Sequence, residues 1–150
     1  MSINNELKQA IRQRANYLCE YCHSSERLSA GRFTIEHLIP KSLGGFDDPK
    51  NLALACRRCN ERRYNFIAGF DPETEMVVPL FNPRQNQWQE HFIWLNRGLL
   101  IKGITPIGRA TCIRLDLNDS RYPEADSIRE TRRFWLKTGL HPPAEDLCED

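Results

Sequence analysis

The sequence has no long apolar run, and no apolar segment stands near its start. Its 150 residues contain nothing that approaches the ~20 consecutive apolar residues needed to cross a bilayer. The first residues, MSINNELKQAIRQR, lack the apolar stretch of a signal peptide. These absences exclude a helical membrane-spanning protein and predict a cytoplasmic location with no membrane partner.

The chain also has little net charge, no internal repeat and no low-complexity tract. Its formal net charge is +1, a value that does not by itself indicate a nucleic-acid partner. The distribution of charge is more informative. Residues 1–70 hold 11 Lys and Arg against 7 Asp and Glu, whereas residues 71–150 hold 10 against 13. A basic first half is the direction expected for a phosphate-binding surface.

The six cysteines are not expected to form a disulfide framework, because a chain without a leader stays in a reducing compartment. Four of them form two C-x-x-C pairs, Cys19 with Cys22 and Cys56 with Cys59. Two such pairs are typical of a structural zinc site, in which each pair is held by a tight turn or a helix start. The alternatives are a redox pair and a haem c attachment site. Two pairs in one small chain disfavour a redox motif, and the haem c signal CEYCH normally belongs to exported proteins.

Hydrophobic spacing predicts the elements of the first half. Leu7, Ile11 and Leu18 favour an amphipathic helix over residues 4–17. RFTIEHL alternates like a strand, the Gly- and Pro-rich PKSLGGFDDPK reads as a loop, and NLALA is a second strand. CRRCNERRYNFIAG then predicts a helix that ends near Gly69.

The second half predicts a mixture of strands and helices. Three strands are expected in MVVPLF, HFIWLN and LLIKGI. Thr105 and Pro106 look like the cap and first residue of a helix, and a last helix is expected over 123–138. The fold class is therefore α+β.

The segments CEYC, IEHLIPKSLGG and NLALACRRCN, with the intervals between them, resemble the HNH endonucleases. The resemblance is to the branch whose ββα-metal fold is stapled by four cysteines, and it covers residues 15–68 closely. The remainder looks like the C-terminal half of small bacterial HNH proteins. The resemblance implies a zinc-stapled nuclease core over residues 1–70, with a mixed strand and helix extension over 71–150 packed on it.

Carried over to this sequence, the resemblance assigns catalytic roles to four residues. His37 is the general base that takes a proton from the attacking water, and Asn51 orients the loop that carries it. Glu36 and Asn60 hold a catalytic divalent ion, although many members of the family have Asp and His at these two positions. A carboxylate and an amide form an all-oxygen site, which favours Mg²⁺, with Mn²⁺ as a substitute. Because neighbours on a strand point to opposite faces, Glu36 and His37 serve one site only if the strand twists or ends there.

A group of basic side chains is expected either to contact phosphates or to form a solvated helix face, and the sequence leaves both open. It consists of Lys41, Arg57, Arg58, Arg62 and Arg63. The expected partner is DNA, with RNA not excluded. A homodimer or a protein partner would use the acidic C-terminal half.

Three functions follow from these patterns. The first is a metal-dependent endonuclease that hydrolyses DNA phosphodiester bonds, with structural zinc and catalytic Mg²⁺ or Mn²⁺. The second is a zinc-dependent nucleic-acid-binding module without catalysis. The third is a nuclease subunit that is silent until it assembles with a partner.

Overall fold

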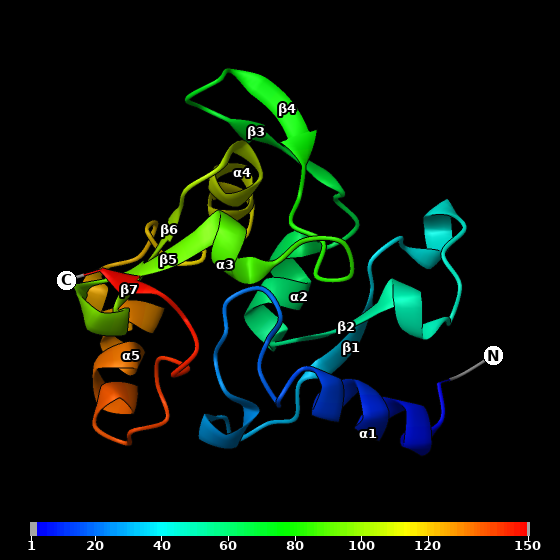
Figure 1. Ribbon diagram of the computed structural model, residues 1–150, viewed down its shortest axis with the longest axis horizontal. Coiled ribbons are helices and arrows are strands. Elements are labelled where there is room, and N and C mark those ends of the chain that lie inside the picture. The colour runs from blue at the N-terminus through cyan, green and yellow to red at the C-terminus, as the bar shows by residue number, and fades with distance from the viewer. Residues whose placement is uncertain (1–2, 150) are drawn as a thin grey trace.

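The computed structural model describes residues 3–149 as a set of short helices and small sheets (Figure 1). The α-helices are α1 (Asn5–Arg14), α2 (Arg57–Arg63), α3 (Trp88–His91), α4 (Pro106–Arg114) and α5 (Ile128–Leu136). The strands are β1 (Thr34–His37), β2 (Leu52–Ala55), β3 (Ala68–Asp71), β4 (Met76–Pro79), β5 (Phe92–Leu95), β6 (Leu100–Gly103) and β7 (Cys148–Glu149). None of the helices in the described part is long and apolar enough to span a bilayer. The content of helix and strand agrees with the predicted α+β class.

A β-hairpin followed by a helix forms the centre of the first half. Strands β1 and β2 pair antiparallel, with Glu36 opposite Ala53 and His37 opposite Leu52. Cys56 caps the N-terminus of α2, since its sulfur accepts a hydrogen bond from the Cys59 N–H. This ββα arrangement, with the cysteines at its base, is the predicted zinc-stapled core.

Helix α2 is shorter than its sequence predicts. The helix expected over residues 56–69 ends at Arg63, and residues 68–71 form β3 instead. At Tyr64 the backbone leaves the helix with φ 49° and ψ −122°. The sequence of residues 56–69 alone did not reveal this end. Residues 68–71 form a strand because they pair with β4, which lies beyond the predicted helix.

The predicted start of helix α4 is confirmed, whereas the last helix begins later than expected. Thr105 caps α4 by accepting from the Gly108 N–H, and Pro106 is its first residue. Helix α5 begins only after Ser127, and a short 3-10 turn precedes it. The pairing of the two-residue strand β7 with β5 was not predicted, because so short a strand has no sequence pattern.

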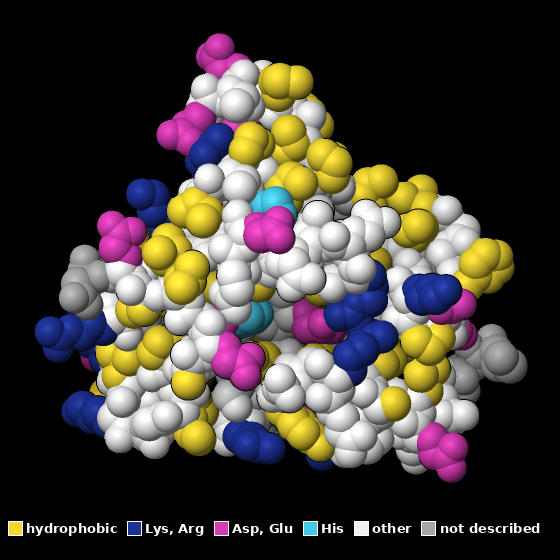
Figure 2. All heavy atoms as spheres, viewed as in Figure 1, with side chains coloured by type: hydrophobic (Ala, Val, Ile, Leu, Met, Phe, Trp, Pro, Cys, Tyr) yellow, Lys and Arg dark blue, Asp and Glu magenta, His cyan; other side chains and the backbone are white. Residues whose placement is uncertain are grey.

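The β3–β4 hairpin packs one face on α4 and leaves the other face open. Phe70, Met76 and Val77 are each more than half exposed, and Figure 2 shows hydrophobic side chains gathered over this hairpin. The sequence predicted that the nuclease core ends at residue 70 and the extension begins at residue 71. Both residues belong to β3.

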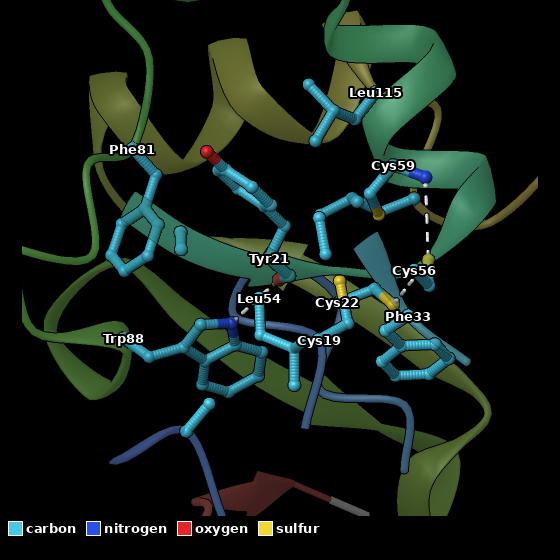
Figure 3. Close-up of a cluster of buried hydrophobic side chains, with 14 of the residues drawn as sticks. Cys19, Tyr21, Cys22, Phe33, Leu54, Cys56, Cys59, Phe81, Trp88 and Leu115 are labelled. Atoms are coloured by element: carbon cyan, nitrogen blue, oxygen red, sulfur yellow. Dashed lines mark hydrogen bonds between the residues drawn. The ribbon is translucent and has the colours of Figure 1, made fainter. Parts of the chain in front are cut away.

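The buried core draws on both halves of the chain (Figure 3). Tyr21 and Leu54 from the first half are fully buried beside Phe81 and Trp88 from the second. The Trp88 indole N–H donates to the Tyr21 carbonyl oxygen at 2.9 Å. The second half therefore covers the base of the hairpin that carries Glu36 and His37.

Candidate functional site

The four cysteines of the two C-x-x-C pairs meet inside the protein. Their sulfur atoms all lie within 4.8 Å of one another, and each cysteine is at most 7% exposed. Figure 3 shows the four side chains converging, Cys19 and Cys22 from the turn over residues 19–22 and Cys56 and Cys59 from the start of α2. A hydrogen bond of 2.9 Å from the Cys19 N–H to the Ser24 carbonyl oxygen closes the turn that carries Cys19 and Cys22.

The chemistry of this cluster fits zinc. Burial raises the pKa of the Cys19 thiol, whereas hydrogen bonds with the other cysteines hold the pKa of Cys22 well below its ordinary value. One thiolate is thus favoured within a group of thiols that share protons. Four sulfur ligands in a closed, buried arrangement are typical of structural Zn²⁺ and unsuitable for Mg²⁺. The cluster is a candidate structural zinc site.

A separate, open depression of about 440 Å³ lies along β1 and past its end. Glu36 and His37 border it from the strand, Lys41 from the following loop, and Asn60 and Tyr64 from α2 and the residue after it. Cys59 and Asn60 are neighbours on a helix, so they point about 100° apart, one to the thiol cluster and the other to the depression. The predicted acid, histidine and amide thus border one open site.

Glu36 lies at the buried side of this depression, with 5% of its surface exposed. One carboxylate oxygen accepts hydrogen bonds from Arg63 and from the Tyr21 hydroxyl, the latter at 3.3 Å. The other oxygen, Oε2, is buried and has no hydrogen-bond partner among the described residues. Burial raises the pKa of Glu36 to about 7, and Arg63 and Tyr21 only partly offset this effect. The free oxygen is therefore a place where a cation would compensate a costly buried charge.

His37 is the last residue of β1, and its ring contacts the loop that follows the strand. Its Nε2 lies 2.6 Å from Asp47 Oδ1, and the Lys41 ammonium lies 3.5 Å from the same oxygen. The hydrogen bond with His37 is the main cause that lowers the pKa of Asp47. Asp47 was not predicted as a site residue. The only sequence signal was an acid shortly after the glycine pair of the predicted loop.

Asn51 ties the two ends of this loop together. Its side-chain oxygen accepts from the Ile39 N–H at 2.8 Å, and its amide donates to the carbonyls of Ile39 and Phe46 at 3.1 and 3.0 Å. Gly45 lies so close to Ile39 that an added Cβ would stand 1.7 Å from its carbonyl oxygen. The loop therefore has one tight path, which places Asp47 beside His37.

The five basic residues lie in different surroundings. Lys41 is exposed at the depression, and Arg57 is exposed but pairs with Glu61 at 2.8 Å. Arg58 and Arg62 both lie 2.6 Å from Asp119 Oδ1.

Arg63 lies inside the protein. It is 4% exposed and donates to Glu36 and to the carbonyls of His37 and Leu38. Contrary to the sequence expectation, Arg63 presents no charge on the surface, and Arg58 and Arg62 are engaged by Asp119. Local sequence did not reveal this, because Asp119 and Glu36 lie far along the chain from these arginines.

Comparison with known protein families gives one match. A family model described as HNH endonuclease matches residues 19–66. Searches among curated proteins and solved structures find no match. The matched segment holds all four cysteines and every residue of the depression named above. HNH domains act on nucleic acids, so the match indicates a nuclease type of function. Residues 19–66 thus match an HNH endonuclease domain, and the clustered cysteines fit the branch that is stapled by four cysteines.

Proposed function

We propose that this protein is a metal-dependent endonuclease that hydrolyses DNA phosphodiester bonds at the depression along β1. The observation that supports this most directly is that Glu36, His37 and Asn60 border one open depression within an HNH domain. A nucleic-acid-binding module without catalysis has no need of this combination. RNA remains an alternative substrate of the same chemistry.

In this proposal His37 is the general base. Its contact with Asp47 is satisfied when Nε2 carries the proton, which leaves Nδ1 free to accept a proton from the attacking water. Asp47 is then a positioning residue, because it fixes the tautomer and the orientation of the ring. Asn51 acts indirectly, because it fixes the conformation of the loop that carries Asp47.

Glu36 and Asn60 would hold the catalytic divalent ion. The orphaned Glu36 Oε2 and the side-chain oxygen of Asn60 are hard oxygen donors, and the depression leaves room for water and phosphate. This donor set fits Mg²⁺ or Mn²⁺. When bound, such an ion stabilises the negative charge that develops on the phosphate. Arg63 neutralises the remaining oxygen of Glu36 and holds the end of β1 through two carbonyls.

In this proposal Lys41 and Arg57 are the members of the predicted basic group that would contact phosphates. Lys41 borders the depression, and the Arg57 side chain is 89% exposed at the start of α2. Both would position the strand without reading its sequence.

The test is cleavage of supercoiled plasmid by the zinc-loaded protein, with and without Mg²⁺, beside His37→Ala. We expect nicked or linear plasmid only when Mg²⁺ is present and only with the unaltered protein. Lys137→Ala, a change at the exposed residue that follows α5 and does not border the depression, is the control and should cut as the unaltered protein does. Circular dichroism and zinc content should be the same in all three proteins. Plasmid and single-stranded DNA that both stay intact with Mg²⁺ or Mn²⁺ would refute the proposed activity.

A further inference from the structure

Tyr64 stands at the rim of the catalytic depression in an unusual conformation. Its side chain borders the depression together with His37 and Asn60, yet 69% of the residue is exposed. Its backbone, with φ 49° and ψ −122°, lies where a bulky residue is a genuine outlier. Such a conformation costs free energy and persists where the surroundings hold it, often at functional sites. Core packing does not explain this residue, because most of it faces solvent.

A second aromatic ring and a cation continue the rim away from the depression. The ring of Phe66 lies 6.4 Å from that of Tyr64, centroid to centroid, and is tilted by 60°. The guanidinium carbon of Arg114 lies 3.3 Å from the centroid of Phe66. Arg114 makes no ion pair with any residue between 3 and 149, so its charge is not neutralised by a carboxylate. The series Tyr64, Phe66 and Arg114 is called the aromatic rim below.

The aromatic rim leads from the catalytic depression into a groove on the other side of Phe66. Phe66, Phe70, Ile113 and Arg114 line this groove, which is largely apolar. The aromatic rim begins at the proposed catalytic depression and combines aromatic rings with a cation that has no carboxylate partner. Surfaces that bind single-stranded nucleic acids have this composition. There, bases stack on aromatic rings and cations contact the backbone.

We propose that the aromatic rim binds unpaired nucleobases, so that the substrate is a strand whose bases next to the scissile phosphate are not stacked in a duplex. This inference rests on the proposed nuclease function and adds the class of substrate to it. In a duplex both faces of each base are covered by its neighbours, and only an unpaired base offers a free face to Tyr64. The face of Phe66 that Arg114 does not cover takes the next base, and the Arg114 charge attracts the neighbouring phosphate.

The experiment measures binding without cleavage. His37→Ala serves as the background, so that the strand stays intact during the measurement. The probes are a fluorescein-labelled oligothymidylate of 12 nucleotides, an abasic strand of equal length and a duplex of equal length, each in Mg²⁺. Fluorescence anisotropy gives the dissociation constant for each probe. The abasic strand keeps the phosphates and lacks the bases, so it separates stacking from charge.

We expect the background protein to bind oligothymidylate at least 5-fold more tightly than the abasic strand. Adding Tyr64→Ala should weaken binding to oligothymidylate about 10-fold and to the abasic strand less than 2-fold. Tyr64→Phe keeps the ring face and should bind as the background does. Phe134→Ala removes a similarly exposed ring on α5 and is the matched control, with no expected change. Tyr64→Gly replaces the alanine variant if that variant does not fold, because glycine accepts the positive φ.

Several outcomes would overturn the inference. These are equal affinity for the oligothymidylate and the abasic strand, equal losses on both strands in Tyr64→Ala, or a loss confined to the duplex. Each of these leaves the proposed nuclease untouched. Failure of the nuclease itself would appear separately, as absence of cleavage by the unaltered protein on plasmid and on single strands.

Discussion

At the scale of single residues, the site depends on partners that fix each reactive side chain. His37 is held by Asp47, Glu36 by Arg63 and Tyr21, and the loop between them by Asn51. These partners decide which atoms stay free. Nδ1 of His37 and Oε2 of Glu36 are the two atoms that the proposed chemistry uses.

Replacing Asp47 by Asn should lower kcat of plasmid cleavage about 10-fold or more and change KM less than about 2-fold. An amide can donate to Nε2 as well as accept from it, so it no longer selects the tautomer that leaves Nδ1 free. Asp48→Asn is the matched control. Asp48 only caps a turn by accepting from the Lys50 N–H at 2.8 Å, a bond that asparagine also makes. Equal rates for the two variants would remove Asp47 from the mechanism.

At the scale of elements, helix α2 connects the catalytic hairpin with the second half of the chain. One face carries Cys59 to the thiol cluster, and Asn60 borders the depression. Arg58 and Arg62 reach Asp119 in the second half. Asp119 also accepts from the Ile128 N–H at 2.6 Å, at the start of α5. One buried carboxylate thus joins two helices that are far apart in the sequence.

Asp119→Asn should lower the free energy of unfolding by roughly 3 kcal/mol at pH 7, because it leaves two arginine charges without their buried partner. Burial raises the pKa of Asp119, but the hydrogen bonds from Arg58 and Arg62 and the charge of Arg58 outweigh burial and keep the pKa below its ordinary value. A carboxyl group whose pKa is lower in the folded chain than in the unfolded chain stabilises the fold at pH values above its pKa in the unfolded chain. This stability is lost as the pH falls through its pKa in the folded chain. The difference in the free energy of unfolding between Asp119→Asn and the unaltered protein should therefore be constant from pH 8 to 5 and should decrease below about pH 4.

Urea denaturation of the zinc-loaded proteins measures this difference. Glu124→Gln is the control, since the Glu124–Arg133 pair is about half exposed and should contribute less than ~1 kcal/mol. A difference between Asp119→Asn and the unaltered protein that grows on acidification would contradict the assigned role.

The elements also show which features a sequence reveals. The cysteine spacing, the β1–β2 hairpin and the cap of α4 were predictable because each depends on residues that are close in the sequence or on a fixed ligand geometry. The end of α2, the role of Asp119 and the pairing of β7 depend on contacts between distant segments. Asp47 lies between these cases, since it is only 10 residues from His37, but many loop acids have no partner. Position in a loop alone does not identify a site residue.

At the scale of the whole molecule, the thiol cluster and the core form one buried unit. In the sequence Tyr21 lies between the two cysteines of the first pair, and the Trp88 indole N–H from the second half donates to its carbonyl oxygen. His23, directly after Cys22, stacks on Trp88 with ring centroids 4.1 Å apart and contacts Asp146 at 2.7 Å. The C-terminal segment is therefore attached to the turn that would hold zinc.

Removal of zinc should consequently unfold both halves of the chain together. A chelator should release about one zinc ion per chain, and at the same time the fluorescence of Trp88 and Trp94 should shift to longer wavelength. The reason is that zinc binding supplies much of the folding free energy of proteins with such sites. Both signals should follow a single transition, since Trp88, Trp94 and the four clustered cysteines belong to the same core. Cys112→Ser, outside the cluster, should keep the zinc content, whereas Cys59→Ser should lose it. If zinc left with no change in tryptophan fluorescence, the second half would fold independently, and the cluster would stabilise the hairpin and α2 alone.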